Sequence, residues 1–215
     1  MIAAVLSVLV VFIILLVSEW LWRTKRLRGE FGRKLVHISV GSFVAFWPFY
    51  MSFHYIQLIS LAFLLVVLIS SKLHLFHAVY KIDRKSWGNI LFAVGIGLTA
   101  LLTSSHWIFM AAILHLSLAD GLAAVIGKHF GQARQYKVFT ATKSVVGTAT
   151  FWLVSALILL YVLTQGATSQ TLTLPLLIWL PVASAVIENL GIYGLDNVLV
   201  PLFIVLTLSQ LKFIS

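Results

Sequence analysis

The sequence that starts at Asp120 reads Asp120-Gly-Leu-Ala-Ala-Val-Ile-Gly-Lys-His-Phe-Gly, continues through a basic segment, and ends at Lys143-Ser-Val-Val-Gly147. Apolar runs precede and follow this stretch, so an aspartate and a lysine are expected at the inner ends of two membrane-spanning helices. An acidic side chain at the centre of a membrane helix costs about 3 kcal/mol unless it faces protein, water or a partner. Asp120 is therefore expected to face a partner, and the basic residues of the chain are candidates.

The composition around this stretch is that of a membrane protein. The chain has 215 residues, of which 61% are hydrophobic and 10% are charged, and a helical span needs about 17 to 25 apolar residues. We predict an all-α fold, a polytopic transmembrane helical bundle of seven or eight spans. The whole chain, 1–215, is expected to form a single integral-membrane domain, with an anchor span at 1–22 and a bundle over about 30–205 that carries the candidate site. The predicted spans are approximately 2–22, 36–52, 55–71, 88–104, 107–127, 144–164, 171–189 and 198–214.

The positive charges predict the orientation of this bundle. If the N-terminus is outside, every lysine and arginine except Lys212 falls in an inner loop or at the inner end of a span. This bias follows the positive-inside rule and predicts a multi-pass protein whose basic face is cytoplasmic. A pI of about 10.1 then records topology, and no nucleic-acid partner is expected. The absence of cysteine excludes disulfides and thiolate metal sites.

A basic cluster opens the second predicted span. Arg33, Lys34 and His37 are three or four residues apart, so their side chains face broadly one way on a helix. Two fixed cations and an imidazole at an inward-facing helix N-terminus suit phosphate oxygens, because the helix dipole also favours anions there. The alternative is a stop-transfer cluster whose long side chains reach the interface. We favour phosphate binding because His37 faces the same way.

Small residues follow Asp120 along its helix. The span that begins near Trp107 reaches Asp120 after 13 residues, or about 20 Å at 1.5 Å each, which places the carboxylate in the inner third of the membrane. Gly127 and Gly131 lie on the same face, so this stripe either packs tightly on another helix or leaves room for a ligand. By contrast, His115 is interpreted as a packing residue.

The next span is predicted to start with a cation. Lys143 is followed by Ser144 and, a turn later, by Gly147. A second inward-facing helix N-terminus would then carry a positive charge. We count these three residues, together with Gly127 and Gly131, among the candidate residues that bind the nucleotide or its phosphates.

Carboxylates gather near the ends of the last two spans. Glu188 ends the seventh span, and Asp196 and Asn197 begin the eighth after a short turn. Asp196 or Asn197 as a helix N-cap is the plain structural interpretation. A set of oxygen ligands would instead suit Mg²⁺, which prefers carboxylates and substrate phosphates. The candidate metal ligands are Asp120, Glu188, Asp196 and Asn197.

Together these residues suit phosphoryl transfer. Carboxylates hold a metal, and the metal with Arg33, Lys34 and Lys143 neutralises a polyphosphate. Such a site would join a cytoplasmic nucleotide to a substrate in the bilayer. The sequence has no Gly-x-x-x-x-Gly-Lys-Ser/Thr loop and no set of protein-kinase motifs, so a nucleotide would be bound in another way.

Five motifs in one order resemble the family of CTP-dependent polyprenol and lipid kinases. This family includes dolichol kinase, phytol and farnesol kinases and a CTP-using diacylglycerol kinase, and it is related to phosphatidate cytidylyltransferases. The resemblance covers nearly all of the chain from Arg33 to Pro201. Many members have a glutamate in the loop near Asp83, where this chain has Lys85-Ser86-Trp87. The motifs are Arg33-Lys34-Leu-Val-His37, Asp83-Arg84-Lys85-Ser-Trp-Gly, Asp120-Gly-Leu-Ala-Ala-Val-Ile-Gly-x3-Gly, Lys143-Ser-x2-Gly and Glu188-x5-Gly194-Leu-Asp196-Asn197-x3-Pro201.

The resemblance implies that CTP is the phosphate donor, with Mg²⁺ as cofactor and the hydroxyl of an isoprenoid alcohol or diacylglycerol as acceptor. Asp120, Lys143 and His37 are the predicted catalytic residues, with His37 or a carboxylate as the base. One alternative is cytidylyl transfer to a phosphatidate-like lipid. The other is a small transporter in which Asp120 relays ions. The oligomeric state and the identity of the lipid are left open.

Overall fold

The fold is a bundle of helical rods, known from a computed structural model that describes residues 1–27, 29–73, 87–166 and 173–210. The apolar runs of the sequence form these helices, and short polar or glycine-containing turns join them. The prediction of an all-α membrane bundle is confirmed. The helices are α1 (Ile2–Arg23), α2 (Gly29–Ala45), α3 (Phe53–Leu73), α5 (Gly88–Leu102), α6 (His106–Leu114), α7 (Asp120–Phe130), α8 (Val145–Gly166), α9 (Thr173–Leu190) and α10 (Asp196–Gln210), with a short 3₁₀ turn at Trp47–Phe49.

Four stretches of helix are long and apolar enough to cross a membrane: Ile2–Arg23, Phe53–Ser70, His106–Phe130 and Val145–Gly166. Shorter apolar helices, Gly88–Leu102, Leu174–Leu190 and Asp196–Gln210, lie beside them. Large apolar side chains cover the outside of the bundle, for example on α1 and α3. This surface is typical of a protein that is surrounded by lipid.

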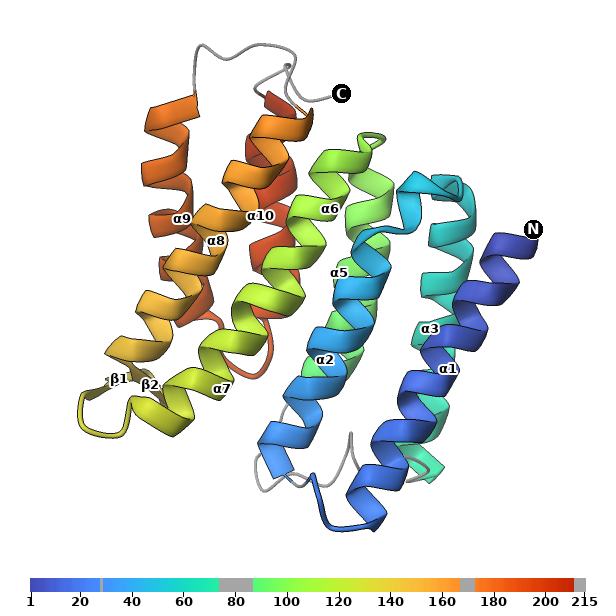
Figure 1. Cartoon of the computed structure of the whole chain (residues 1–215), viewed down its shortest axis with the longest axis horizontal. Helices are drawn as coiled ribbons and strands as arrows, with labels where there is room; N and C mark the ends of the chain where they lie inside the picture. The colour runs from blue at the N-terminus through green and yellow to red at the C-terminus, as the bar shows by residue number, and fades with distance from the viewer. Residues whose placement is uncertain (28, 74–86, 167–172, 211–215) are drawn as a thin grey trace.

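The longest rod lies at the centre of the bundle. Helices α6 and α7 form one continuous rod, His106–Phe130. In its apolar 18-residue segment, 78% of the residues are buried inside the bundle. A π-helical turn, His115–Ala119, joins the two helices. Helices α8, α9 and α10 lie on one side of this rod, while α2, α1 and α3 lie on the other (Figure 1).

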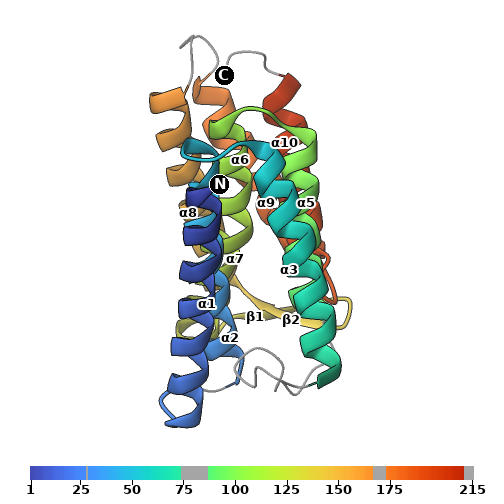
Figure 2. The same cartoon turned by 90° about the vertical axis from the view of Figure 1, so that its right-hand side faces the viewer.

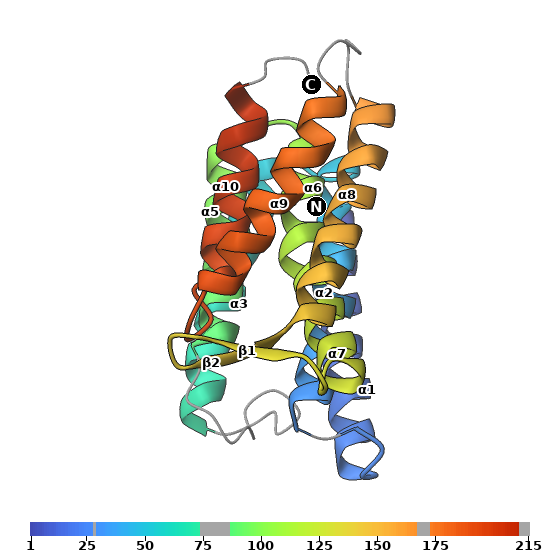
Figure 3. The ribbon, with the colours of Figure 1, turned by 90° about the vertical axis from the view of Figure 1, so that its left-hand side faces the viewer.

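A short β-hairpin marks one end of the molecule, which we call the hairpin end. Strand β1 (Gln135–Val138) pairs antiparallel with β2 (Ala141–Ser144), and Tyr136 lies opposite Lys143. The hairpin crosses this end of the bundle near α7 (Figures 2 and 3), whereas α1 begins and α10 ends at the opposite end (Figure 1). No pattern in the sequence predicts this hairpin.

One predicted helix start is wrong, and another is confirmed to within one residue. Helix α2 begins at Gly29, before the predicted start at 36, so Arg33, Lys34 and His37 lie inside the helix and not at its N-terminus. Lys143 lies on strand β2, and α8 begins only at Val145. Arg33 and Lys34 therefore do not occupy a helix N-terminus, whereas Lys143 directly precedes Ser144, whose Oγ accepts from the Gly147 amide at the start of α8. The predicted motif at Asp83-Arg84-Lys85 lies outside the described residues.

Candidate functional site

A buried ion pair joins α2 to the central rod at the hairpin end. The Lys34 ammonium donates to Asp120 Oδ2 at 2.5 Å, and both side chains are more than nine-tenths buried. The π-helical turn directly before Asp120 shifts the register of the rod, and the Asp120 amide bonds to the carbonyl of His115. Such turns are often found at functional sites in helices. The aspartate that the sequence placed in the membrane thus has a lysine partner, as expected.

His37 supports this pair from the next turn of α2. Its Nε2 lies 2.8 Å from the carbonyl oxygen of Leu116 and 3.4 Å from Asp120 Oδ2. Because a carbonyl can only accept, this nitrogen carries the proton. The other side of the ring packs against Phe92, with ring centroids 4.3 Å apart. His37 is therefore placed to hold the Asp120 carboxylate.

A second ion pair lies across the site. The Lys143 ammonium bonds to the Glu188 carboxylate, and it lies 3.2 Å from the Glu188 carbonyl oxygen. Burial alone would lower the pKa of Lys143, but Glu188, with smaller effects of Asp196 and Asp120, raises it above its ordinary value. Lys143 is consequently charged at neutral pH, and the hairpin holds its charge against α9.

A tight turn brings Asp196 to the same place. Gly194 has φ of +94°, a conformation that glycine adopts at little cost. A Cβ at Gly191 would lie 2.5 Å from Asp196 Cβ, so the chain closes tightly between α9 and α10. Asp196 Oδ1 accepts from the Asn197 amide at 3.1 Å.

Three carboxylates meet at this point, and we call them the acidic cluster. Oxygens of Asp120, Glu188 and Asp196 all lie within 4.8 Å of one another. Lys34 and Lys143 hold the first two, and no lysine or arginine among the described residues forms an ion pair with Asp196. Oxygen donors at this spacing suit a hard divalent cation such as Mg²⁺.

The acidic cluster and both lysines line a cavity, the polar pocket, with a volume of about 450 Å³. This volume lies within the usual range for small-molecule sites. Helices α2, α7, α8, α9 and α10 and the hairpin all contribute to its wall. Its lining residues are Gly29, Glu30, Lys34, Asp120, Ala123, Ala124, Gly127, Lys128, Gln135, Ala141, Thr142, Lys143, Ser144, Gly147, Thr148, Glu188 and Asp196.

Close packing of α7 on α8 shapes one wall of the polar pocket. A Cβ at Gly127 would lie 2.9 Å from the Cα of Gly147, and one at Gly131 would lie 2.5 Å from Ser144 Cβ. Ser144 Oγ accepts from the Gly147 amide at 3.0 Å and donates to the Gly127 carbonyl at 3.2 Å. The small stripe after Asp120 therefore packs on a helix, while Gly127, Ser144 and Gly147 also line the pocket.

Four predicted site residues do not line the polar pocket: His37, described above, and Arg33, Asn197 and Gly131. Arg33 is buried and pairs with Glu30 on its own helix. The side-chain amide of Asn197 donates to the Gly194 carbonyl at 3.0 Å, and its Oδ1 is buried without a partner among the described residues. Ser144 occupies the space that a side chain at Gly131 would need. These residues support the site and do not line it.

No sequence pattern indicates that several further residues belong to the site. Glu30 and Lys128 line the polar pocket. Tyr136, Thr148 and Asn189 form a hydrogen-bonded set beside it, which we call the hydroxyl–amide cluster. The position of Asn189 directly after Glu188 was the one available hint.

A second hollow adjoins the polar pocket between α2 and the end of α7. It holds about 420 Å³ and shares Glu30, Lys34 and Lys128 with the polar pocket. Its other side chains include Phe31 and His129. A ligand in the polar pocket has room to extend into this hollow.

The fold and the site define a class: a membrane-embedded helical bundle with a buried acidic cluster and two lysines at one end. A curated relative is the phytol kinase of Synechocystis sp. (strain ATCC 27184 / PCC 6803 / Kazusa), with 31% identity over 195 residues, 88% of this chain and 82% of the relative. The chain belongs to the polyprenol and phytol kinase family, which confirms the resemblance found in the sequence. No family model matches the chain, and no solved structure matches it.

Proposed function

We propose that this protein is a lipid kinase that transfers the terminal phosphate of CTP to the hydroxyl of an isoprenoid alcohol. The observation that carries the proposal is the ionic cluster: three carboxylates and two lysines line one pocket at an end of a membrane bundle. The phytol kinase relative supports an isoprenoid alcohol as acceptor. The family resemblance supports CTP as donor.

The acidic cluster fits Mg²⁺ by its chemistry. All three ligand groups are carboxylates, and their oxygens are close enough to converge on one ion. Asp120, Glu188 and Asp196 would hold the ion. When bound, Mg²⁺ would neutralise phosphate charge in the transition state.

The lysines have two roles in this proposal. Each one holds a carboxylate of the acidic cluster in place, Lys34 at Asp120 and Lys143 at Glu188. Both also face the polar pocket, where their remaining N–H groups are directed to phosphate oxygens. Lys128 adds a third positive charge at the wall.

The neighbouring hollow is proposed to take the nucleoside. It opens from the polar pocket next to Lys34 and Lys128, so a triphosphate on the lysines places its ribose and base there. Phe31 and His129 supply rings on which a base can stack. Replacement of Phe31 by alanine should raise the KM for nucleotide.

The transfer itself forms one bond and breaks one. The alcohol oxygen attacks the γ-phosphorus, and the bond from that phosphorus to the β–γ bridging oxygen breaks. The products are the lipid monophosphate and CDP. A carboxylate oxygen of the acidic cluster that does not hold the ion takes the proton of the hydroxyl, because these carboxylates line the pocket and His37 does not.

The protein is proposed to span the membrane several times with the hairpin end in the cytoplasm. Every lysine and arginine whose side chain is described lies at the hairpin end, from Arg23 at the end of α1 to Lys143 on β2. This distribution follows the positive-inside rule. It would expose the polar pocket to cytoplasmic nucleotide.

Labelled nucleotide in vesicles tests the proposal and separates it from its alternatives. With γ-labelled CTP, a kinase moves the label into the lipid fraction. A cytidylyltransferase instead releases it as pyrophosphate and moves an α-label into the lipid. A transporter moves neither label into lipid. Absence of γ-label transfer to phytol, polyprenols and diacylglycerol alike would refute the kinase proposal.

A further inference from the structure

An apolar groove runs along the membrane-facing side of α8 and α9 and meets the polar pocket at one residue. The groove, which we call the α8–α9 groove, has a volume of about 420 Å³. Its floor contains Ala149 and Ala185, and its sides contain Trp152, Val182 and Val186. These three side residues are 43–52% exposed, so the groove is open to surrounding lipid.

Thr148 belongs both to this groove and to the polar pocket. It therefore marks the junction between an apolar slot and a charged site. The hydroxyl–amide cluster lies at this junction: Asn189 Oδ1 accepts from Tyr136 at 2.9 Å, and Asn189 Nδ2 donates to Thr148 Oγ1 at 3.2 Å. Asn189 directly follows Glu188 of the acidic cluster.

We propose that the α8–α9 groove holds the hydrocarbon chain of the alcohol substrate and that the hydroxyl–amide cluster binds its hydroxyl. This inference rests on the proposed kinase function. An alcohol with a long chain needs an apolar surface that ends where phosphate is bound, and this junction provides it. The hydroxyls of Tyr136 and Thr148 can each donate to and accept from a substrate hydroxyl, and Asn189, which bonds to both, acts as a positioning residue.

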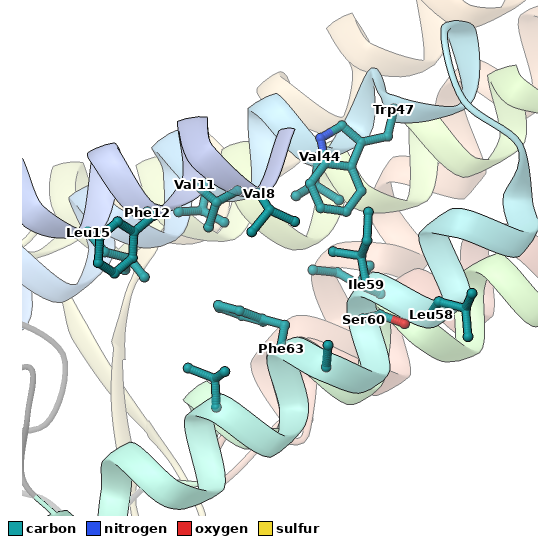
Figure 4. A pocket seen from close by; sticks show the side chains of 14 residues that line it. Val8, Val11, Phe12, Leu15, Val44, Trp47, Leu58, Ile59, Ser60 and Phe63 are labelled. Carbon is teal, nitrogen blue, oxygen red and sulfur yellow. The ribbon is translucent and has the colours of Figure 1, made fainter. Parts of the chain in front are cut away.

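A second apolar cavity, of about 400 Å³, lies elsewhere in the bundle and provides the rival location. It lies between α1, α2 and α3, where Val11, Val44 and Phe63 face one another (Figure 4). It shares no lining residue with the polar pocket. The packed rings of His37 and Phe92 lie one helical turn beyond its lining residues Val40 and Ile96, toward Asp120. A chain in that cavity would have to pass these rings to reach the acidic cluster.

Two exposed alanines give a matched test. Ala149 lines the α8–α9 groove, and Ala62 lines the rival cavity. In the purified full chain in vesicles, Ala149→Trp should raise the KM for a long isoprenoid alcohol about tenfold. The KM for CTP should stay unchanged, and the KM for a single-isoprene alcohol should rise less than that for the long alcohol. Ala62→Trp should change none of these values.

A second variant tests the junction without adding bulk. Tyr136→Phe removes only a hydroxyl, and it should raise the KM for long and short alcohols alike by about twofold to tenfold, the range of one neutral hydrogen bond. The KM for CTP should not move. If Tyr136 only stabilised the fold, its replacement would instead change the KM for the alcohol and the KM for CTP together.

The outcomes separate the groove from the kinase activity. A rise in KM with Ala62→Trp but not with Ala149→Trp would place the chain in the α1–α3 cavity and overturn the proposal. Unchanged alcohol KM values in Ala149→Trp and Tyr136→Phe would also overturn it. Wild-type protein that phosphorylates no alcohol would refute the proposed function itself, and the groove assignment with it.

Discussion

At the scale of single residues, the site depends on two buried ion pairs whose partners come from different parts of the chain. Lys34 and Asp120 are separated by 86 residues, and Lys143 and Glu188 by 45. A buried pair contributes little net stability, because desolvation of both charges offsets their attraction. Removal of one partner of the pair, however, leaves the charge of the other partner buried and uncompensated. A contribution to fold stability therefore does not by itself account for the two pairs.

Asp120→Asn should lower phosphate transfer at least about 100-fold, because the acidic cluster would lose a carboxylate that is proposed to hold the metal. The carboxylate is the member of the acidic cluster that both Lys34 and His37 contact. Initial rates with labelled CTP measure the effect. The matched control is Glu19→Gln, which removes a carboxylate that pairs with Arg23 on α1 away from the site.

A double variant separates folding from activity. Lys34→Met or Asp120→Leu alone leaves one buried charge and should destabilise the fold by about 3–5 kcal/mol. Both changes together should restore most of the stability, since no charge is left unpaired. Thermal unfolding in detergent measures this, and the double variant should still be inactive. Activity in a well-folded double variant would contradict a role of this pair in catalysis.

His37→Ala should lower kcat about 10- to 100-fold, which is typical for a residue that orients a ligand group. His37 Nε2 donates to the Leu116 carbonyl and His37 does not line the polar pocket, so we propose that it orients Asp120 and does not act as the base. The pH profile of kcat should therefore keep its shape. His37→Gln, which can still donate to that carbonyl, should recover part of the rate. A lost acidic limb in the pH profile of His37→Ala would instead make His37 the base.

At the scale of secondary structure elements, close approaches of backbone position the acidic cluster. A Cβ at Gly95 on α5 would lie 2.1 Å from the carbonyl oxygen of Asn197, next to Asp196 at the start of α10. A backbone atom cannot move away as easily as the end of a side chain. The packing of α5 on α10 therefore determines the position of Asp196.

Gly95→Ala should accordingly destabilise the protein by about 1–3 kcal/mol, the usual cost of overpacking, and also lower activity by displacing Asp196. Gly97→Ala on the same helix is the control, because its Cβ would meet only the flexible Ser60 hydroxyl at 3.0 Å. Thermal midpoints and rates of both variants should be compared. Equal behaviour of the two variants would show that α5 does not position the first turn of α10.

Helix periodicity and apolar runs predicted most elements, but not the two that shape the site. The π-helical turn before Asp120 has no sequence signature, because it depends on contacts such as His115 to Ser155 Oγ at 2.7 Å. The β-hairpin consists of short polar segments that resemble an ordinary loop. By contrast, the three carboxylates stand out in the sequence, because charges in apolar runs are rare and need partners, and the structure brings them together.

The pairing within that group could not be predicted. Arg33 and Lys34 are adjacent in sequence and have the same charge, yet Lys34 reaches Asp120 while Arg33 pairs with Glu30. The direction of each side chain depends on where α2 begins, and the sequence placed that start too late. The pairing of Asp120 with Lys34 rather than with Lys143 follows from the same three-dimensional detail.

At the scale of the whole molecule, the bundle separates a charged end from an apolar body. Charged side chains gather at the hairpin end, and the buried core between the helices is almost entirely apolar over the described residues. This separation is expected if one substrate comes from water and the other from the membrane. Because the two ends of the bundle differ, the orientation of the protein in the membrane can be measured.

The chain has no cysteine, so single cysteines can report the orientation. Lys137→Cys lies on the hairpin, and Ser52→Cys lies before α3 at the opposite end; both positions are exposed. On intact cells, a membrane-impermeant thiol reagent should label Ser52→Cys and not Lys137→Cys. After lysis, both should be labelled. The opposite pattern on intact cells would place the polar pocket outside the cell.

The central claim is that the ionic cluster transfers a phosphoryl group to a membrane alcohol. Mass spectrometry of lipids from vesicles that contain the purified protein, phytol, Mg²⁺ and CTP tests it most directly. We predict that phytyl monophosphate forms with the wild-type protein, that CTP supports more product than ATP, and that Asp120→Asn forms none. Phytyl monophosphate at equal rates with wild type and Asp120→Asn, or its absence with every nucleotide and alcohol tried, would contradict the claim.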